Sequence, residues 1–337
     1  MTIKDIAKEC NCGIGTVSRV LNNHPSVSEE TREKVLSIVN KYGFVLNKNA
    51  KELKMHDNKT IVIFVKGTSN VLLNSMLEVI QKKIETLPYN ASVINLDEDG
   101  NEALYANNVC YELKPMGMIF LGGSPDRYKE DFLKIKIPCV FISNQAESLE
   151  NKNLSSVSTD NLLASEFSAD YLINKGHKKI GVIGGNLETS EISKIRYQGF
   201  LNSMNKAHLQ FDFDKAYITS KYSYSGGAKA AKKLIEQYPD LTAIFTMSDT
   251  MAIGACRQLK DMNYDIPEKI SIIGFDGLSL ANFFCPRLTT IKQQEVILAE
   301  EGLQILLDSI LQNTEAVHKI IPFRLITGES VKDIRAI

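Results

Sequence analysis

The sequence has few features of a secreted, membrane-spanning or disulfide-bonded protein. Its six cysteines lie at positions 10, 12, 110, 139, 256 and 285 of 337 residues, a spacing too sparse for a disulfide framework. The opening MTIKD has no apolar stretch of the kind that a signal peptide contains, and no run of about 18 apolar residues could cross a bilayer. We therefore expect a cytoplasmic chain with reduced thiols and no membrane partner.

Signals of catalysis are also missing. The sequence has no Ser-His-Asp string, and GVIGGN at 181–186 lacks the Gly-x-Gly-x-x-Gly spacing of a dinucleotide-binding loop. We therefore expect that the protein is not an enzyme and uses no cofactor.

What is present is a globular composition with an uneven charge. Hydrophobic residues make up 44% of the chain and charged residues 23%, both ordinary values, and the length predicts two or three packed units. Residues 1–60 carry a net charge of +3, whereas the remainder carries −4. A basic head on an acidic body is typical of a module that binds a polyanion, joined to a neutral or acidic core.

The first 60 residues predict three short helices joined by tight turns, the layout of a helix-turn-helix. Thr2 is the predicted N-cap of the first helix, and Asn11 suits the left-handed backbone of the turn after it. Ser28 is the predicted cap of the third helix, which ends at Gly43. The predicted inner faces hold Ile6, Ala7 and Cys10, then Ile14, Val17, Val20 and Leu21, and then Val35, Ile38 and Val39.

From Thr60 onward, short apolar runs alternate with amphipathic segments. The runs include TIVIFV, ASVINL, MGMIFL, IPCVFIS, KIGVIGG, KAYIT, TAIFTM and ISIIGFD, and the predicted helices include 71–87, 161–175, 190–205, 223–237 and 249–262. Strands that alternate with helices predict parallel sheets covered on both faces. There are too many strands for one sheet, so we expect two doubly wound lobes. Ligands of such sheets bind beyond the carboxyl ends of the strands, which here is the cleft between the lobes.

The stretch CNCGIGTVSRVLN at 10–22 allows three interpretations. A metal clip needs further Cys or His ligands, but only His24 is near, and Cys10 lies on a predicted apolar face. A phosphate loop should follow a strand, whereas a helix precedes this stretch. A DNA-reading helix fits the polar Thr16, Ser18 and Arg19. Composition alone does not separate that helix from an ordinary solvated helix face. We expect no metal site.

Longer strings resemble a known family. TIKDIAKECNCGIGTVSRVLNNHPSVSEETREKV is similar to the N-terminal domain of the LacI/GalR family of bacterial transcription regulators. The strings VSTDNLLASEFSADYLINKGHKKIGVIGG, FTMSDTMAIGACRQLKDMNYDIPEKISIIGFDG and CPRLTTIKQQ resemble the family's core, and the resemblance is weakest over 66–155.

The resemblance implies an α-helical helix-turn-helix head plus an α/β periplasmic-binding-protein-like core of two doubly wound parallel-sheet lobes. The implied parts are a DNA-binding domain at 1–46, a hinge helix or linker at 47–59, an effector-binding core at 60–331 and a tail at 332–337. Lobe one takes 61–159 and 292–319, and lobe two takes 160–290 and 320–331.

For DNA, the resemblance places the second helix in the major groove. It implies base contacts by Ile14, Gly15 and Arg19 and phosphate contacts by Thr16 and Ser18. Gly13 and Gly15 each cost about 1 kcal/mol in a helix interior and less near an end, and Gly15 offers no side chain to a base, so we expect sparse direct readout. In the hinge, Asn47, Ala50, Leu53 and Lys54 match DNA-contacting positions. Leu53 is the candidate minor-groove wedge, and the alternative is a tether with Leu53 packed on the core.

For the effector, the resemblance implies contacts by Ser69, Asp160, Arg196, Tyr222, Ser248, Asp276 and Gln293, with a sugar as the ligand. Asp and Arg suit neighbouring sugar hydroxyls. Asp160 has an alternative as a simple helix cap. The family's aromatic platform after the first strand is Asn70-Val71-Leu72-Leu73 here. A purine-, sugar-phosphate- or phosphocarrier-responsive regulator is therefore the alternative.

The resemblance also implies a homodimeric repressor on palindromic double-stranded operator DNA, with effector binding shifting the population of lobe arrangements. The predicted helix 71–87 is a candidate part of the dimer interface, and its alternative is a core helix. A periplasmic sugar-binding protein is a further alternative that the DNA-binding head argues against.

Overall fold

The computed structural model describes residues 3–21, 27–41 and 59–335. The chain divides into two compact units, Met1–Asn58 and Lys59–Ile337, and each is described by itself. The predictions for Thr2, His24 and Gly43, and for the linker residues 47–58, lie outside the described residues.

The head unit contains three helices, α1 (Ile3–Glu9), α2 (Ile14–Leu21) and α3 (Glu29–Lys41). They enclose a small apolar core of Ile6, Ala7, Cys10, Val17, Val20, Val35 and Val39, with Leu21 and Ile38 packed at its edge. This confirms the predicted inner faces except at Ile14, which is 48% exposed. Ile14 is the first residue of α2, where the helix has not yet turned toward the core, so its apolar side chain faces outward.

The turn between α1 and α2 explains why Asn11 occupies it. Asn11 has φ 50°, and Cys12 N–H donates to Ala7 O at 2.9 Å while Asn11 N–H donates to Lys8 O at 3.3 Å. This pair of bonds around a left-handed residue satisfies the last carbonyls of the helix. Gly13 O then accepts from the N–H groups of Thr16 and Val17, so Gly13 caps α2 rather than weakening its interior.

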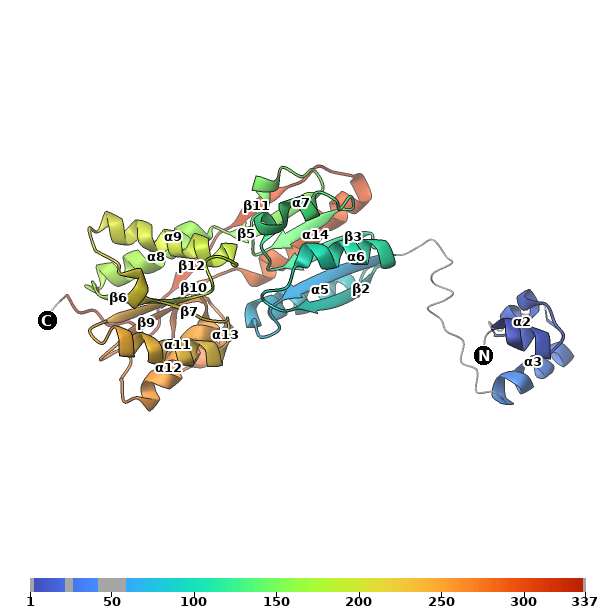
Figure 1. Cartoon of the computed structure of the whole chain (residues 1–337), viewed down its shortest axis with the longest axis horizontal. Coiled ribbons are helices and arrows are strands. Elements are labelled where there is room, and N and C mark those ends of the chain that lie inside the picture. The colour runs from blue at the N-terminus through green and yellow to red at the C-terminus, as the bar shows by residue number, and fades with distance from the viewer. Residues whose placement is uncertain (1–2, 22–26, 42–58, 336–337) are drawn as a thin grey trace. The chain divides into compact units, whose positions relative to one another are not determined.

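The second unit holds two six-stranded sheets (Figure 1). The first has the order β11-β5-β4-β3-β1-β2 and is parallel throughout. Its strands are β1 (Thr60–Lys66), β2 (Asn90–Leu96), β3 (Gly117–Leu121), β4 (Cys139–Ile142), β5 (Leu154–Thr159) and β11 (His318–Ile321). The inner strands β3 and β4 are buried on both faces, as parallel strands in the middle of a sheet require, whereas the edge strands β2 and β11 are partly exposed.

The second sheet repeats that order as β12-β10-β9-β8-β6-β7. Its strands are β6 (Ile180–Gly184), β7 (Tyr217–Thr219), β8 (Ala243–Thr246), β9 (Ser271–Asp276), β10 (Thr289–Lys292) and β12 (Arg324–Ile326). All pair in parallel except the edge strand β12, which runs antiparallel to β10. The two doubly wound lobes are therefore confirmed, with one antiparallel edge that the sequence did not predict.

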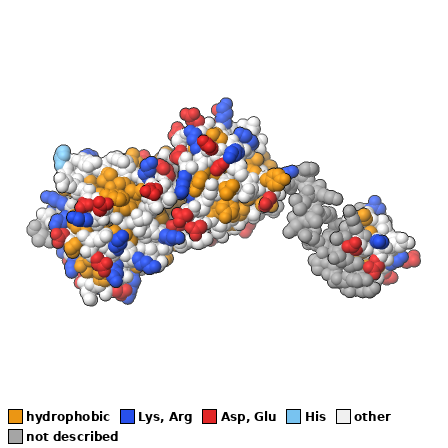
Figure 2. Space-filling model, viewed as in Figure 1, with side chains coloured by type: hydrophobic (Ala, Val, Ile, Leu, Met, Phe, Trp, Pro, Cys, Tyr) orange, Lys and Arg blue, Asp and Glu red, His pale blue; other side chains and the backbone are white. Residues whose placement is uncertain are grey.

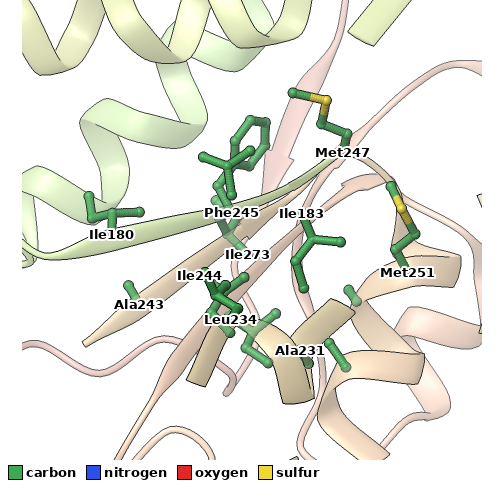
Figure 3. Packing of buried hydrophobic residues seen from close by; sticks show 14 of the residues in the cluster. Ile180, Ile183, Ala231, Leu234, Ala243, Ile244, Phe245, Met247, Met251 and Ile273 are labelled. Atoms are coloured by element: carbon green, nitrogen blue, oxygen red, sulfur yellow. The ribbon is translucent and has the colours of Figure 1, made fainter. Parts of the chain in front are cut away.

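Helices cover both faces of each sheet (Figure 1). Lobe one carries α5 (Val71–Ile84), α6 (Glu102–Glu112), α7 (Lys129–Phe132) and α14 (Glu295–Gln312), with 3₁₀ turns η1 (Pro125–Tyr128) and η2 (Glu147–Leu149). Lobe two carries α8 (Asn161–Asn174), α9 (Glu191–Lys206), α10 (Phe213–Ala216), α11 (Tyr224–Gln237), α12 (Asp249–Asp261) and α13 (Ser279–Phe283). Figure 3 shows how Leu234 and Ala231 of α11 pack against Ile244 and Ile183 of the second sheet.

The chain crosses between the lobes three times. The crossings follow β5, β10 and β11, after Thr159, Lys292 and Ile321. β10 stays paired with β9 to Lys292, and β11 stays paired with β5 to Ile321. The lobe bounds implied by the resemblance stay a prediction.

Candidate functional site

The exposed side of α2 is the first candidate surface. Ile14, Gly15 and Arg19 are exposed, and Thr16 and Ser18 are half-buried, whereas Val17 and Val20 are buried. A side chain added at Gly15 would meet no atom within 4 Å. The surface therefore offers one branched apolar side chain and one guanidinium, with a gap between them. Asn47, Ala50, Leu53 and Lys54 lie outside the described residues.

The second candidate is a cavity of about 360 Å³ between the two lobes. Its walls follow the carboxyl ends of β1, β3, β4, β6, β7 and β9, as the sequence predicted for paired doubly wound lobes. Lobe one contributes Lys66, Asn70, Leu72, Leu73, Glu98, Asp99, Gly122, Gly123, Ser124, Ser143 and Asn144. Lobe two contributes Gly185, Asn186, Thr189, Ser190, Ile192, Arg196, Thr219, Ser220, Lys221, Tyr222 and Asp276.

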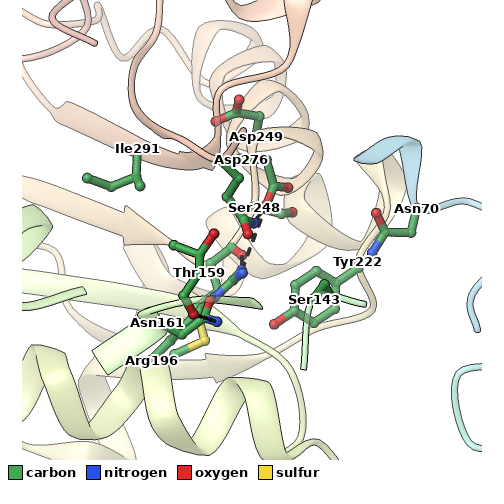
Figure 4. A network of polar contacts seen from close by, with 12 residues as sticks. Asn70, Ser143, Thr159, Asn161, Arg196, Tyr222, Ser248, Asp249, Asp276 and Ile291 are labelled. Carbon is green, nitrogen blue, oxygen red and sulfur yellow. Dashed lines mark hydrogen bonds and ion pairs between the residues drawn. The ribbon is translucent and has the colours of Figure 1, made fainter. Parts of the chain in front are cut away.

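Arg196 on α9 is the centre of the polar wall in lobe two (Figure 4). Its Nε donates to Asn161 Oδ1 at 2.9 Å, and its Nη1 donates to Met247 O at 2.5 Å. Nη1 also lies 3.9 Å from Asp276 Oδ1, and the guanidinium stacks 3.7 Å above the Phe275 ring. The side chain is thus fixed in one orientation at the floor of the cavity.

Asp276 ends β9 with the backbone at φ 122°, a region that residues with a side chain rarely adopt. Its Oδ1 accepts from Gln293 Nε2 at 2.9 Å. Burial raises the pKa of Asp276 to about 6, while Arg196 and the Gln293 bond oppose that rise. Asp276 therefore places a carboxyl in the cavity that titrates near neutrality.

A second buried carboxyl supports the same corner. Asp249 accepts from Thr290 Oγ1 at 2.6 Å and from Leu278 N–H at 2.7 Å. Burial, and then the charge of Asp276, raise the pKa of Asp249 well above its ordinary value. This group holds the ends of β9 and β10 together and does not line the cavity.

A hydrogen bond joins the lobes across the cavity, since Ser124 Oγ of lobe one donates to Thr189 O of lobe two at 3.1 Å. Burial raises the pKa of Glu98 of lobe one, and the Tyr222 backbone N–H and the Lys221 cation of lobe two oppose that rise. Tyr222 itself shares a 2.9 Å hydrogen bond between its hydroxyl and Ser193 Oγ. The lobes thus meet through polar groups at the cavity rim.

Sequence reasoning missed a buried ion pair in lobe one. Lys66 Nζ lies 2.6 Å from Glu102 Oε2, and Glu102 Oε1 accepts from Ser124 N–H at 2.5 Å. Lys66 lines the cavity at the end of β1, and Glu102 begins α6. The one available signal was a lysine that ends the otherwise apolar TIVIFVK.

Three predicted effector residues line the cavity and four do not. Arg196, Tyr222 and Asp276 line it, whereas Gln293 is buried behind Asp276 and its Oε1 has no hydrogen-bond partner among the described residues. Ser248 caps α12 by accepting from Met251 N–H. Ser69 is exposed, and its neighbour Asn70 takes the place at the wall.

Asp160 supports the alternative of a helix cap, since its Oδ1 accepts from Leu163 N–H at 2.9 Å at the start of α8. It also borders a second cavity of about 470 Å³, which shares Asn144 and Ile192 with the first. Among the described residues, no group of three His, Cys, Asp or Glu side chains is arranged to hold a metal ion. None of the described helices is long and apolar enough to cross a membrane.

Comparison with family models gives two matches. Residues 2–47 match the model described as bacterial regulatory proteins, lacI family. Residues 169–331 match the periplasmic binding protein-like domain.

Curated proteins match over nearly the whole chain. The HTH-type transcriptional regulator MalR of Clostridium butyricum is 33% identical, over 99% of this chain and 100% of that protein. The ribose operon repressor of Haemophilus influenzae is 29% identical, over 93% of both chains.

Solved structures agree in fold. A complex of the transcriptional regulator CelR with cellobiose superposes with a TM-score of 0.70 at 22% identity, over 98% of this chain and 99% of that chain. The lac repressor dimer bound to operator and the anti-inducer ONPF superposes with a TM-score of 0.70 at 20% identity, over 98% and 99%. At these identities the likeness shows the fold alone.

Proposed function

Because this chain belongs to the lacI family of bacterial regulatory proteins, we propose that it is a dimeric repressor whose operator affinity is set by a sugar bound between its lobes. The family places the chain among transcription regulators rather than enzymes. One observation supports the proposal most: Arg196 and Asp276 are fixed together on one wall of a polar cavity that both lobes line.

The DNA contacts that we propose start from α2. Ile14 contacts a thymine methyl, Arg19 binds a guanine in bidentate fashion, and Gly15 lets the backbone approach the bases. Thr16 and Ser18 bind phosphates. A good bidentate contact contributes about 1–3 kcal/mol of discrimination, so one arginine leaves much of the specificity to DNA shape.

The hinge proposal rests on sequence alone. Asn47, Ala50 and Lys54 contact DNA, and Leu53 inserts into the minor groove at the operator centre. Replacement of Leu53 by Ala should then weaken binding to operator more than to unrelated duplex. An equal loss on both would reject the wedge.

The effector proposal rests on the charge balance of the cavity. The cation of Lys66 lies against Glu102, and Arg196 lies near Asp276. A neutral ligand with many hydroxyls can use both signs without adding net charge, which favours a sugar over a sugar phosphate. The relative named as the ribose operon repressor supports the same class.

Within the proposed set, we assign each residue a different part. Arg196, Tyr222 and Asp276 contact the sugar directly, and Ser248 and Gln293 hold that wall in place. Ser69 and Asp160 contact only a ligand that extends beyond the cavity. Sugar bound to both walls stabilises the closed arrangement of the lobes, and this population shift changes DNA affinity.

For the dimer interface, we no longer propose the predicted helix 71–87. Its residues Leu72, Leu73, Met76 and Ile80 are buried in lobe one itself. On lobe two, α13 leaves Phe283 85% exposed and Leu280 exposed, a face that a second copy can cover. Figure 2 shows that hydrophobic side chains also gather in separate patches among charged residues on the viewed side.

The experiment that tests the DNA part uses a duplex selected from a random library by the purified protein. Arg19→Ala should lower affinity for that duplex by about 5- to 150-fold, since a lost bidentate contact is worth about 1–3 kcal/mol, while sedimentation still shows a dimer. Unchanged affinity would refute the recognition helix. Failure to select any sequence would refute the proposed function.

The effector part is tested by thermal shift against sugars, sugar phosphates and nucleobases. A sugar that raises the unfolding temperature should also change affinity for the selected duplex. If only nucleobases or phosphates stabilise the protein, the sugar proposal is wrong and the alternative class replaces it.

A further inference from the structure

The Cys-x-Cys pair of the head unit has no part in the proposed function. Cys10 and Cys12 lie on either side of Asn11 in the turn between α1 and α2. Cys12 Sγ donates to Cys10 O at 3.3 Å, and Cys10 Sγ donates to Ala7 O at 3.6 Å. Both thiols are thus held against the backbone of the turn that joins α1 to α2, with one residue between them.

The two thiols differ in access. Cys10 is 0% exposed in the core of the head unit, whereas Cys12 is half-buried and packs at the edge of that core. Burial, and then the neighbouring Cys12 thiol, raise the pKa of Cys10, so Cys10 is held as a neutral thiol. A small oxidant in solution therefore reaches Cys12 first.

We propose that Cys10 and Cys12 form an oxidation site for hydroperoxides, and that their disulfide switches off DNA binding by α2. The Cys12 thiol gives up its proton, its thiolate attacks the terminal oxygen of ROOH, the O–O bond breaks, and the alkoxide takes up that proton and leaves as ROH, which yields Cys12 sulfenic acid. The Cys10 thiol then gives up its proton, its sulfur attacks the Cys12 sulfur, the S–O bond breaks, and the hydroxide takes up that proton and leaves as water. Two thiols and ROOH become one disulfide, ROH and water, and the peroxide takes up both electrons.

The turn cannot keep its present geometry in the oxidised form. A disulfide needs a dihedral angle near 90° about its S–S bond and a short, fixed separation of the two Cβ atoms. The Cys10 sulfur has to turn away from the core, where it now lies against the apolar side chains of Ile6, Val17 and Val35. The hydrogen bonds from Cys12 N–H to Ala7 O and from Asn11 N–H to Lys8 O fix the backbone of this same turn. Closing the disulfide ring therefore shifts α1 relative to α2 and moves Ile14 and Arg19 away from the positions in which they contact DNA.

The test begins with the chemistry, which does not depend on the proposed function. Trypsin cleaves after Lys8 and Arg19, so peptide 9–19 contains both thiols and no other cysteine. After treatment of the full chain with hydrogen peroxide, this peptide should lose two hydrogen atoms in mass and regain them with dithiothreitol. A peptide that keeps its reduced mass, or that stops at a higher oxidised acid, overturns the proposal.

The second readout rests on the proposed function, because it uses the duplex selected by the reduced protein. Peroxide should lower affinity for that duplex at least 10-fold, and dithiothreitol should restore it. Cys12→Ser should bind like the reduced protein and ignore peroxide. Cys285→Ser, which removes an exposed thiol of the core unit, should respond like the unchanged chain. A disulfide that leaves affinity unaltered, or a Cys12→Ser protein that still responds, overturns the switch.

Amide hydrogen exchange tests whether the disulfide changes the head unit even if the proposed DNA-binding function is wrong. Oxidation should speed exchange in α1 and α2 more than in the second unit, whatever DNA the protein binds. If the disulfide forms and exchange in α1 and α2 stays unchanged, the proposed shift of the turn is wrong.

Discussion

The two lobes share one strand order and differ in how they hold their polar residues. Lobe two fixes Arg196 through Asn161, Met247 O and Asp276, all buried at the end of its sheet. Lobe one contributes one buried pair, Lys66 with Glu102, together with the carboxylates of Glu98 and Asp99 and with hydroxyl or amide side chains from its loops. The same fold therefore supplies a rigid recognition wall on one side and an adaptable wall on the other.

This difference suggests that the two lobes contribute differently to ligand binding. A network in which every group is tied to several others has one geometry and recognises one arrangement of hydroxyls. A wall of short loop side chains changes with few consequences for stability. We expect lobe two to set whether a sugar binds, and lobe one to set which sugar closes the cleft.

The largest effect should follow replacement of Arg196. Arg196→Met leaves Asp276 buried without its cation and Met247 O without its donor. Breaking a buried ion pair costs about 3–5 kcal/mol, so thermal unfolding of the core unit should occur at a clearly lower temperature, with loss of the sugar response. A variant with normal stability would show that the lobe-two wall is not rigid. Lys194→Met on the exposed side of α9 is the matched control.

Removal of the lobe-one cation should cost less. Lys66→Met breaks the pair with Glu102, but Lys66 borders a cavity that water can enter, and Glu102 keeps its bond from Ser124 N–H. In urea unfolding, we expect the free energy of unfolding to fall by about 2–3 kcal/mol, which is less than the value for a fully enclosed pair. The double variant Lys66→Met, Glu102→Gln should recover part of it. A loss equal to that of Arg196→Met would remove the contrast between the lobes.

The buried carboxyl of lobe two predicts a pH dependence. Its pKa rises from 3.8 to about 6 on folding, so between those values the folded state binds the proton more tightly than the unfolded chain does. Stability from Asp276 is therefore full below about pH 4 and falls as pH rises to 6, by about 2–3 kcal/mol. The difference in unfolding free energy between the unchanged chain and Asp276→Asn should follow this slope. A flat difference contradicts the pKa.

The smallest effect should come from the contact between the lobes. Ser124→Ala removes the bond to Thr189 O, and one such bond contributes about 0.5–1.5 kcal/mol. Urea unfolding should show a loss of unfolding free energy of that size or less. Small-angle X-ray scattering should show a larger fraction of molecules with the two lobes apart. Ser148→Ala, in a surface bond of lobe one, is the control. An unchanged distribution of open and closed molecules would mean that this bond does not hold the lobes.

The sequence predicted lobe two better than lobe one for a physical reason. Asp276 lies in a long string that resembles the family, and the resemblance implies an effector contact for both Asp276 and Arg196. The Lys66–Glu102 pair joins residues 36 positions apart, and no local pattern shows that β1 and α6 bring them together. The prediction named Ser69, whereas its neighbour Asn70 lines the cavity. Both lie in a loop, which has no repeating pattern that shows the direction of a side chain.

Periodicity also failed in an instructive way at Ile14. Its spacing from Val17 and Val20 is helical, so the pattern assigned it to the core, yet it is the first residue of α2 and faces outward. Helical spacing predicts which residues of one helix share a face. It does not predict how far the neighbouring helices extend along that face. The outward side chain is what the DNA contact implied by the resemblance requires, and that contact stays a prediction.

The empty space at Gly15 bears on how this protein can evolve. A Cβ at this position would meet no atom within 4 Å, and almost any residue favours a helix more than glycine does. A single substitution there thus adds a chemical group to the exposed face of α2 and strengthens the helix at once. Under the proposed function, one substitution at Gly15 therefore changes which DNA sequence α2 prefers, without a second mutation to restore stability.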